Sequence, residues 1–325
     1  MLARYRHSEI KNNQVPMTDF SMDRRDEFDS SRAELIKLSC LICGSDSFKE
    51  IGQVDRYGFY YPTGVCKRCG NVQQIEYYDS DTLDDFYANY YRDIYLGQPP
   101  QDLFEEQLTR GSGILSFVTP FIPGGHILEI GTGAGGILKA FKEAGTYDVH
   151  GLDFDERYIG YGRSQGIEIT LGGIGDVGKG KTFDLIIVSH VLEHIVDPSA
   201  LLKDAKKLLK ESGKIYIEVP SLNQVFNGGY EFDLLLYFQN AHVIHYSVDS
   251  LRILLKQCGL NVLKMDDLIC CICEKDDTQI IDEDERYKGM YKKQEDLLAS
   301  IERRRWWRQF PLPKKISKKF IRKFI

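Results

Sequence analysis

Short apolar runs alternate with longer segments of helical spacing through the middle of the chain. The clearest runs lie at 127–130, 149–153, 167–171, 183–188 and 214–219. Such runs, separated by helical segments, are typical of parallel strands that are buried on both faces. Two more apolar strands follow at 261–264 and 267–274. The pattern therefore predicts an α/β domain built on a mostly parallel sheet.

The remaining pattern divides the chain into segments of different character. We expect an arm that is flexible or packs only on a partner at 1–34, a small β module at 35–78, an aromatic-rich helical linker or lid at 79–115, the α/β domain at 116–275 and a charged tail at 276–325. Within the α/β domain, residues 223–246 form an aromatic-rich insertion, and Ser247 is expected to cap the helix that follows it.

The linker carries aromatic side chains at helical spacing. Ser80 is expected to cap a helix on which Phe86, Tyr87, Tyr90 and Tyr91 recur. The aromatic stripe either packs against the α/β domain or forms a lid over a bound acceptor. As part of a lid, Tyr90 or Tyr91 would contact the acceptor and assist removal of a proton, because a phenol can do both.

The first apolar run leads into a glycine-rich turn, HILEIGTGAGG, at 126–136. Gly131, Gly133 and Gly136 lack a Cβ atom, so the backbone can pass close to a ligand before a helix begins near Ile137. The turn predicts an adenosine-containing cofactor. Its spacing also satisfies the dinucleotide fingerprint, so a nicotinamide-dependent oxidoreductase is an alternative at this point.

Charged and polar residues follow the second and fourth strands. Asp153 ends the second strand about 20 residues after the glycine turn, where a carboxylate can accept the ribose hydroxyls, or else it caps the helix near Glu156. His190, Glu193 and His194 follow the strand at 183–188. Ligands of open α/β sheets bind at the carboxyl ends of the strands, so these side chains are expected in a site.

Together these motifs resemble the class I S-adenosylmethionine-dependent methyltransferases. The resemblance spans about 117–274 and rests on HILEIGTGAGG, GLDFD, FDLIIVSHVLEHIVDP and LLKESGKIYIEVP. It implies a Rossmann-like seven-stranded sheet, mostly parallel, with an antiparallel C-terminal hairpin formed by 261–264 and 267–274. It also implies S-adenosylmethionine as the cofactor.

The resemblance further implies which residues contact the cofactor. Taken from the methionine moiety through the ribose and adenine to the sulfonium, they are Glu129, Gly131, Thr132, Gly133, Asp153, Phe154, Gly173, Ile174, Ser189 and His190. Many relatives have an acidic residue where Gly173 aligns, so the sequence departs from the family pattern at the adenine edge.

Four of the eight cysteines form two pairs, Cys40-x-x-Cys43 and Cys66-x-x-Cys69, each followed by glycine. Two such turns supply the four thiolates of a closed tetrahedral zinc site. Structural Zn²⁺ is therefore expected in the module at 35–78. The other cysteines, at 258, 270, 271 and 273, lie in apolar surroundings and are interpreted as small buried side chains.

A zinc module ahead of such a domain, with a histidine just before a Tyr-Ser-x-x-x-Leu helix, resembles the C-methyltransferases and related methyltransferases that act on nucleotide-linked sugars. This implies C- or O-methylation of a sugar nucleotide or surface glycan in polysaccharide biosynthesis. C-methylating members usually have glutamate before the first histidine of this segment, whereas Ala241 precedes His242 here. The candidate catalytic residues are His190, His242, Tyr90 and Tyr91.

Other functions stay open from the sequence. RNA or another small molecule is an alternative acceptor, and a non-catalytic zinc-dependent binding module is an alternative of a different class. The net charge of −6 disfavours bulk binding of nucleic acid.

The C-terminal tail has a charge pattern of its own. Ten Lys or Arg and no acidic residue lie between Arg303 and Ile325, and Ile316, Phe320 and Phe324 recur at i+4. This pattern predicts either a basic amphipathic helix in peripheral contact with a membrane or a solvated end. The N-terminus has no apolar core of a secretory signal, and no long apolar run is present. We expect a cytoplasmic protein, with attachment at the inner face of the membrane as one alternative.

Overall fold

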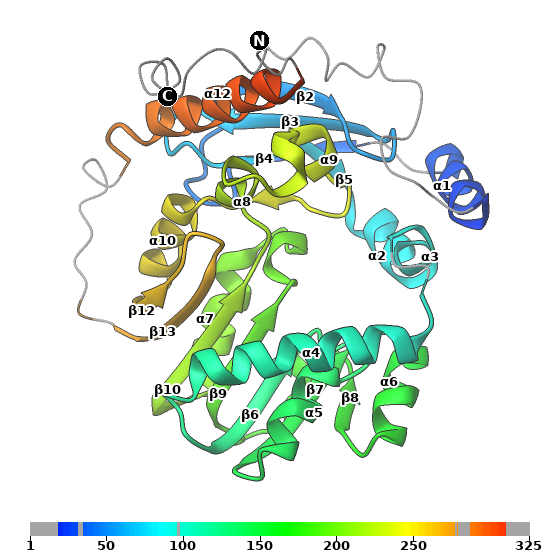
Figure 1. Ribbon diagram of the computed structural model, residues 1–325, viewed down its shortest axis with the longest axis vertical. Coiled ribbons are helices and arrows are strands. Elements are labelled where there is room, and N and C mark those ends of the chain that lie inside the picture. Colours follow the sequence, from blue (N-terminus) through cyan, green and yellow to red (C-terminus); the bar gives the residue numbers. More distant parts are fainter. Residues whose placement is uncertain (1–18, 32–34, 96–97, 277, 279–286, 310–325) are drawn as a thin grey trace, which may run out of the picture.

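Two sheets, one large and one small, organise the computed structural model (Figure 1). The structure describes residues 19–31, 35–95, 98–276, 278 and 287–309. The large sheet and its helices make up the lower part of the molecule in this view, and the small sheet lies above them.

The large sheet has seven strands in the order β12-β13-β10-β9-β6-β7-β8. The five neighbouring strands from β10 to β8 run parallel to one another, whereas β13 pairs antiparallel with β10, and β12 antiparallel with β13. The mostly parallel sheet and its C-terminal hairpin are thereby confirmed. The strands are β6 (Gly125–Ile130), β7 (Tyr147–Asp153), β8 (Glu168–Leu171), β9 (Phe183–Ser189), β10 (Leu209–Glu218), β12 (Leu260–Met265) and β13 (Cys270–Lys275).

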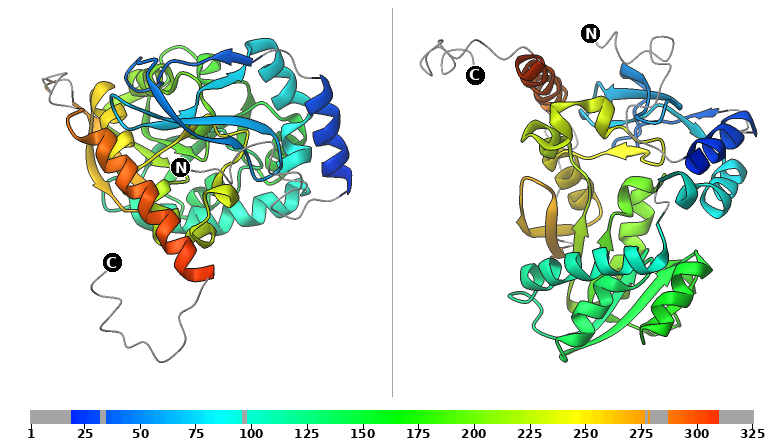
Figure 2. Two further views of the ribbon diagram at one scale, coloured as in Figure 1. Left: turned by 90° about the horizontal axis from the view of Figure 1, so that it is seen from above. Right: turned by 45° about the vertical axis from the view of Figure 1, so that its right-hand side comes forward.

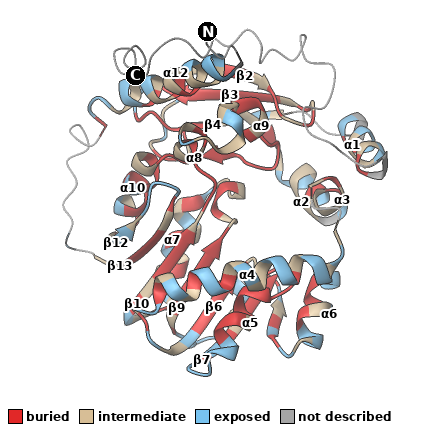
Figure 3. Ribbon diagram, in the orientation of Figure 1, coloured by how far each residue is buried: buried red, intermediate tan, exposed pale blue. Residues whose placement is uncertain are grey.

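Each face of the large sheet is covered by helices, because successive strand residues point to opposite sides. Ile127 and Leu185 pack toward α4 (Pro100–Val118) and α5 (Gly136–Glu143). Leu128 and Ile186 belong to the core on the other face. That core includes residues of α7 (Pro198–Leu208) and α10 (Val248–Gln257). Both faces of the strands are therefore buried, as the apolar runs predicted (Figure 3).

The small sheet joins segments that are far apart in the chain. Its order is β11-β4-β3-β2, formed by β2 (Phe48–Val54), β3 (Tyr60–Cys66), β4 (Val72–Gln74) and β11 (Ile244–His245). A separate two-stranded sheet pairs β1 (Leu35–Lys37) with β5 (Glu76–Tyr78). Because β11 lies in the predicted insertion and pairs with β4, the insertion and the cysteine module share one sheet.

Both ends of the described chain pack more closely than the sequence suggested. In the expected arm, α1 (Asp19–Ser31) buries Phe28, whose ring lies 4.9 Å from that of Phe86. In the expected tail, α12 (Met290–Gln309) buries Leu298 and Ile301 against apolar residues of the small sheet. Figures 1 and 2 show α12 lying along this sheet. These two segments are therefore part of the fold.

Helix boundaries in the linker differ from the expectation. Asp79, not Ser80, caps α2 (Ser80–Asn89), because its carboxylate accepts the Thr82 amide at 2.8 Å. The helix ends at Asn89 with Tyr90 as its C-cap residue, and a second short helix, α3 (Tyr91–Tyr95), follows. The predicted single aromatic face is thus divided at Tyr90.

Helix boundaries in the α/β domain also differ from the expectation. The histidine segment forms a 3₁₀ turn, η4 (Leu192–His194), and the next long helix, α7, begins only at Pro198. Ser247 caps α10 as predicted. Asp155, rather than Asp153, caps α6 (Glu156–Ser164).

The cysteines outside the two pairs are mostly buried. Cys258, Cys271 and Cys273 are buried, as predicted, whereas Cys270 is partly exposed.

Across the described ranges, no helix is long and apolar enough to span a bilayer. The segment 310–325, for which peripheral membrane contact was predicted, lies outside the described residues.

Candidate active site and cysteine cluster

The expected cofactor residues converge at the carboxyl ends of adjacent strands. Glu129 lies near the end of β6, Asp153 ends β7 and Ser189 ends β9. These strands are neighbours in the sheet, with β9 and β7 on either side of β6. The sheet thus assembles side chains from distant parts of the sequence at one edge.

The glycine turn begins directly after β6. Gly131 and Gly133 have φ angles of 70° and 57°, which favour glycine. A Cβ atom on Gly131 would lie 2.4 Å from Cγ2 of Val191, and one on Gly133 would lie 2.9 Å from the side chain of Gln107. Gly136 serves a different purpose from the one expected, because a Cβ there would lie 2.1 Å from the Phe104 carbonyl oxygen. It permits close packing of α5 on α4.

Asp153 fixes the conformation of this turn. Its Oδ2 atom accepts the Gly133 amide at 2.7 Å, and its Oδ1 atom accepts the Asp155 amide at 2.9 Å. Arg92 of α3 donates to the same Oδ1 at 3.0 Å and also pairs with Asp155. The side chain of Arg92 stacks on Tyr158, with its guanidinium carbon 4.2 Å from the ring centroid. The linker therefore contacts the carboxylate that the sequence assigned to the ribose.

Glu129 is a buried carboxyl group, only 1% exposed. Its Oε2 atom accepts a hydrogen bond from Thr132 Oγ1 at 2.6 Å. Burial raises the pKa of Glu129 to about 8, although the Thr132 hydroxyl acts in the opposite direction. A cationic ligand group beside this carboxyl would stabilise its ionised form.

The residues expected at the adenine edge lie next to one another. Phe154 is 76% exposed, and a Cβ on Gly173 would lie 3.1 Å from Cζ of its ring. Ile174 follows in a 3₁₀ turn, η3 (Ile174–Asp176). Asp176 accepts the Gly173 amide at 2.9 Å. An acidic residue therefore lies beside Gly173, three positions later than the position at which relatives were expected to have it.

His190 follows β9 in a left-handed conformation, with φ of 54°. Its Nδ1 lies 3.4 Å from Glu193 Oε1, and its Nε2 lies 3.7 Å from Glu218 Oε1. Burial disfavours the charged ring, but the two carboxylates outweigh this effect and raise the pKa of His190 to about 9. Ser189 donates to Glu218 Oε2 at 3.0 Å. An uncommon backbone conformation thus holds an imidazole between two carboxylates.

The insertion brings His242 to this region. Its ring centroid lies 4.9 Å from that of His194. His242 is 8% exposed, and burial lowers its pKa well below the usual value, with neighbouring histidines adding to the effect. This environment makes His242 a poor general base at neutral pH. His245 is a core residue of β11, where burial lowers its pKa to about 3.

Of the two candidate tyrosines, only Tyr91 faces the histidines. Its ring centroid lies 5.5 Å from that of His194. Tyr90 instead contacts α1, with the Arg24 guanidinium carbon 4.4 Å from its ring centroid and the Phe28 ring at 5.1 Å. Tyr90 is therefore removed from the catalytic candidates, because the end of α2 at this residue turns it away.

The four paired cysteines come together at the edge of the small sheet. Cys40 Sγ lies 3.5 Å from Cys69 Sγ, and Cys43 Sγ lies 3.5 Å from Cys66 Sγ. All four sulfur atoms lie within 4.8 Å of one another. Thiolates at about 2.3 Å from a tetrahedral ion are separated by roughly 3.8 Å, so the cluster fits such an ion.

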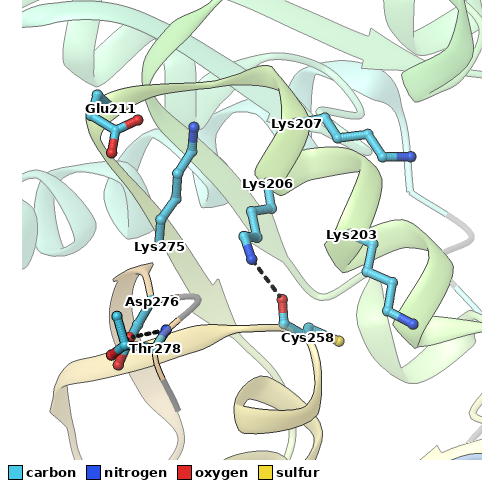
Figure 4. A pocket seen from close by; sticks show the side chains of 8 residues that line it. All are labelled: Lys203, Lys206, Lys207, Glu211, Cys258, Lys275, Asp276 and Thr278. Atoms are coloured by element: carbon cyan, nitrogen blue, oxygen red, sulfur yellow. Dashed lines mark hydrogen bonds between the residues drawn. The ribbon is translucent and has the colours of Figure 1, made fainter. Parts of the chain in front are cut away.

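A basic pocket lies apart from these residues (Figure 4). It is found near the start of β10, whereas Glu218 is at the other end of that strand. None of the predicted site residues lines it. Its lining residues are Lys203, Lys206, Lys207, Glu211, Cys258, Lys275, Asp276 and Thr278.

Sequence reasoning missed three contributors to the site: Arg92, Glu218 and Gln107. Gln107 of α4 donates to the Thr132 carbonyl at 3.0 Å and thereby braces the glycine turn. Glu218 was detectable, because it ends an apolar strand just before Pro220. Arg92 and Gln107 gave no such signal, since each reaches the site from a helix outside the strand pattern.

Comparison with known proteins identifies the α/β domain. Residues 104–265 match the family model of a methyltransferase domain. Over 111 residues the chain is 30% identical to an uncharacterized protein of Methanocaldococcus jannaschii, covering 34% of this chain and 52% of that protein. Over 120 residues it is 28% identical to a ubiquinone biosynthesis O-methyltransferase of Idiomarina loihiensis, covering 34% of this chain and 49% of the relative. The chain thus spans about half the length of these curated relatives.

Solved structures include similar chains. DesVI of Streptomyces venezuelae has a TM-score of 0.43 and 13% identity, with 54% of this chain and 96% of that chain covered. The plantazolicin methyltransferase BpumL in complex with SAH has a TM-score of 0.44 and 16% identity, with 68% and 88% covered.

The family match favours methyl transfer over the nicotinamide-dependent chemistry that the glycine turn left open. The strand order and the match define residues 104–265 as a class I S-adenosylmethionine-dependent methyltransferase domain.

Proposed function

We propose that this chain transfers the methyl group of S-adenosylmethionine to a hydroxyl oxygen of a sugar nucleotide or surface glycan. One observation carries the proposal: His190 lies between Glu193 and Glu218 at the carboxyl edge of the sheet that also presents the glycine turn. A titratable group beside a cofactor turn is suited to removing the acceptor proton.

The residues at the sheet edge fit the proposed cofactor. Glu129 would face the cofactor's ammonium group, Asp153 its ribose, and Phe154 with Gly173 its adenine. When bound, S-adenosylmethionine supplies an electrophilic methyl group on a positively charged sulfonium. Glu129 supports this placement, because a buried carboxyl group with a single hydroxyl donor still has capacity to pair with a cation.

The chain's own residues would align the acceptor and accept its proton. Methyl transfer needs the acceptor oxygen in line with the methyl group, so positioning accounts for much of the catalysis. Ser189 and Glu218 hold the position of His190. A like charge near His190 disfavours the imidazolium, so a bound sulfonium would lower the pKa of His190 from about 9 and favour proton acceptance.

Two observations favour oxygen over carbon as the methylated atom. The C-methylating proteins that the sequence resembles usually have glutamate where this chain has Ala241, and Ala241 is fully buried. The curated relative of Idiomarina loihiensis is named as an O-methyltransferase. Its named pathway, ubiquinone biosynthesis, makes a phenolic small molecule a second acceptor class worth testing.

We also propose that Cys40, Cys43, Cys66 and Cys69 bind one structural Zn²⁺. Four converging sulfur donors leave no coordination position for a substrate, so this ion would stabilise the fold without taking part in methyl transfer. Cys66 ends β3 of the small sheet, and the turn at Gly70 lies against Met290 at the start of α12.

The decisive experiment is incubation of the purified full chain with methyl-labelled S-adenosylmethionine and separate acceptor panels. The panels are sugar nucleotides, lipid-linked glycans, phenolic quinone precursors and RNA. We expect label in a sugar-containing acceptor, as a base-stable ether. Label confined to RNA or to the phenolic panel would overturn the sugar assignment, and no cofactor binding would overturn the whole proposal. His126→Ala is the control for His190→Ala, because His126 lies near the opposite end of β6.

A further inference from the structure

A second group of potential metal ligands lies beside His190. It consists of Glu193, His194 and His242, and one ligand atom of each lies within 4.8 Å of the others. Glu193 and His194 belong to η4, whereas His242 comes from the segment before β11. The Val243 amide donates to the Glu193 carbonyl at 2.9 Å, which ties the two segments together. A backbone hydrogen bond therefore helps to hold these three residues close to one another.

Glu193 is the most unusual member of this group. It is only 1% exposed, and neither of its carboxylate oxygens has a hydrogen-bond donor among the described residues. A buried carboxylate without hydrogen-bond donors is costly, and the His190 ring at 3.4 Å offsets only part of that cost as an ion-pair partner. Glu193 Oε1 lies 3.9 Å from His194 Nε2 and 4.0 Å from His242 Nε2.

The orientation of His194 shows which of its nitrogens is available. Nδ1 lies 2.9 Å from the Ala241 carbonyl oxygen, which can only accept, so Nδ1 carries the hydrogen. In the neutral ring, Nε2 then directs its lone pair toward Glu193. Metal-binding histidines are usually held in this way, with the far nitrogen donating to a carbonyl or carboxylate.

His190 does not supply the hydrogen-bond donors that Glu193 lacks. Its Nδ1 lies 3.4 Å from Glu193 Oε1 but forms no hydrogen bond with it, and its ring also faces Glu218. It brings no donor to the Nε2 atoms of His194 and His242. His242 Nδ1 is likewise buried without a partner in the described structure.

We propose that Glu193, His194 and His242 bind a divalent transition-metal ion such as Mn²⁺ or Fe²⁺. Two imidazoles and one carboxylate suit these ions and leave positions open for a ligand. Ligand atoms at about 2.1 Å from an ion are roughly 3 to 3.5 Å apart, so closure requires shifts of less than about 1 Å. This site is distinct from the cysteine cluster in both position and donor type.

The catalytic consequence of this site rests on the proposed function. An acceptor hydroxyl on the ion would become more acidic and release its proton to solvent. The O–CH₃ bond would then form as the S–CH₃ bond breaks, with the bonding electron pair remaining on sulfur. No oxidant or reductant is needed, because the ion acts only as a Lewis acid.

Direct binding of MnCl₂ tests the site without cofactor or acceptor. The zinc-loaded full chain is titrated with MnCl₂, and free Mn²⁺ is followed by its electron paramagnetic resonance signal. We expect one bound Mn²⁺ per chain, with at least tenfold weaker binding for Glu193→Gln and His242→Ala. His126→Ala should bind like the wild type, because its side chain is exposed and remote.

Thermal unfolding distinguishes loss of the metal site from misfolding of the variant. Mn²⁺ should raise the Tm of the wild type, whereas Glu193→Gln should fold with a similar metal-free Tm that Mn²⁺ does not change. No Mn²⁺ binding at millimolar concentration, or equal binding by Glu193→Gln, would overturn the proposal. Methyl transfer by a chain that binds no Mn²⁺ would refute the metal site alone, whereas Mn²⁺ binding without methyl transfer would refute the proposed function alone.

Discussion

His190 and Glu218 are joined twice. The His190 amide donates to the Glu218 carbonyl at 2.8 Å, and the ring Nε2 lies 3.7 Å from Oε1 of the same glutamate. The first contact continues the pairing of β9 with β10 past Ser189, and the second places a charge beside the imidazole. The sheet itself therefore determines the position of the candidate base.

Replacement of His190 should impair turnover but not cofactor binding. We expect His190→Ala to lower kcat by about a hundredfold, the usual contribution of a positioned acid or base. The Kd for S-adenosylmethionine should change less than about threefold, as measured by calorimetry. His126→Ala should match the wild type in both measurements. An unchanged kcat for His190→Ala would remove this residue from the mechanism.

Asp153→Asn should weaken cofactor binding by about tenfold to a hundredfold, because a buried acceptor is replaced by a group that also donates. The Gly133 amide and Arg92 would both lose a charged partner. Asp148→Asn on the same strand is the matched control, because the Asp148 side chain is 77% exposed. Calorimetry with both variants separates a local effect from a general one. Equal affinities would contradict the assignment of Asp153 to the ribose.

Cofactor affinity should depend on the ionisation of Glu129. Its pKa is about 8 in the free protein, and the charged groups around it are Asp153, Glu218 and Arg110. A cofactor ammonium requires the ionised form, so binding below pH 8 releases a proton. Affinity should therefore rise by up to about tenfold per pH unit from pH 6 toward 8. Above pH 8 the rise should stop, as the cofactor amine itself loses its proton.

Calorimetry at pH 7 in buffers with different ionisation enthalpies measures this proton release. Glu129→Gln should bind more weakly and release no proton from this position. Proton uptake by the wild type, or an equal release by Glu129→Gln, would show that another group is responsible.

Two glycine substitutions should change stability in opposite directions. Gly136→Ala places a Cβ 2.1 Å from the Phe104 carbonyl oxygen and should destabilise the fold by about 1 to 3 kcal/mol. Gly160→Ala in α6 meets no atom within 4 Å and should stabilise it by about 0.5 to 1 kcal/mol. Urea unfolding measures both. A neutral Gly136→Ala would show that α4 and α5 separate easily.

Loss of one paired cysteine should remove zinc and destabilise the chain. Cys43→Ser is expected to reduce bound zinc from one ion per chain to almost none, and to lower the Tm on the order of 10 °C. Cys270→Ser is the matched control, because Cys270 lies on β13, away from the cluster. Elemental analysis and thermal unfolding give the two readouts. Full zinc content in Cys43→Ser would contradict four-cysteine ligation.

The sequence predicted correctly those features that depend on neighbouring residues, and it missed contacts between distant segments. The strands, the glycine turn and the Ser247 cap depend on neighbouring residues, and the structure has them where expected. The pairing of β11 with β4 joins segments about 170 residues apart, which no local pattern reveals. Similarly, α12 presents few apolar residues among many charges, so its buried Leu298 and Ile301 looked like part of a solvated tail.

The sequence predicted the convergence of those candidate site residues whose positions the strands alone determine. Asp153, Ser189 and His190 follow strand ends, and their convergence comes directly from the strand order. Tyr90 was expected beside the site, but α2 ends at Asn89 and Tyr90 packs against α1 instead. The Arg92–Asp153 pair required the linker to fold back over the sheet edge, which depends on tertiary packing.

The small sheet begins at Phe48, yet one of its edge strands is at Ile244 and the helix that covers it starts at Met290. During synthesis, which proceeds from the N-terminus, the early strands must wait for most of the chain before they gain these partners. A fragment that stops after the cysteine turns would expose the apolar surface that Leu298 and Ile301 cover. The N-terminal sheet can therefore bury its apolar surface fully only after the last helix has been synthesised.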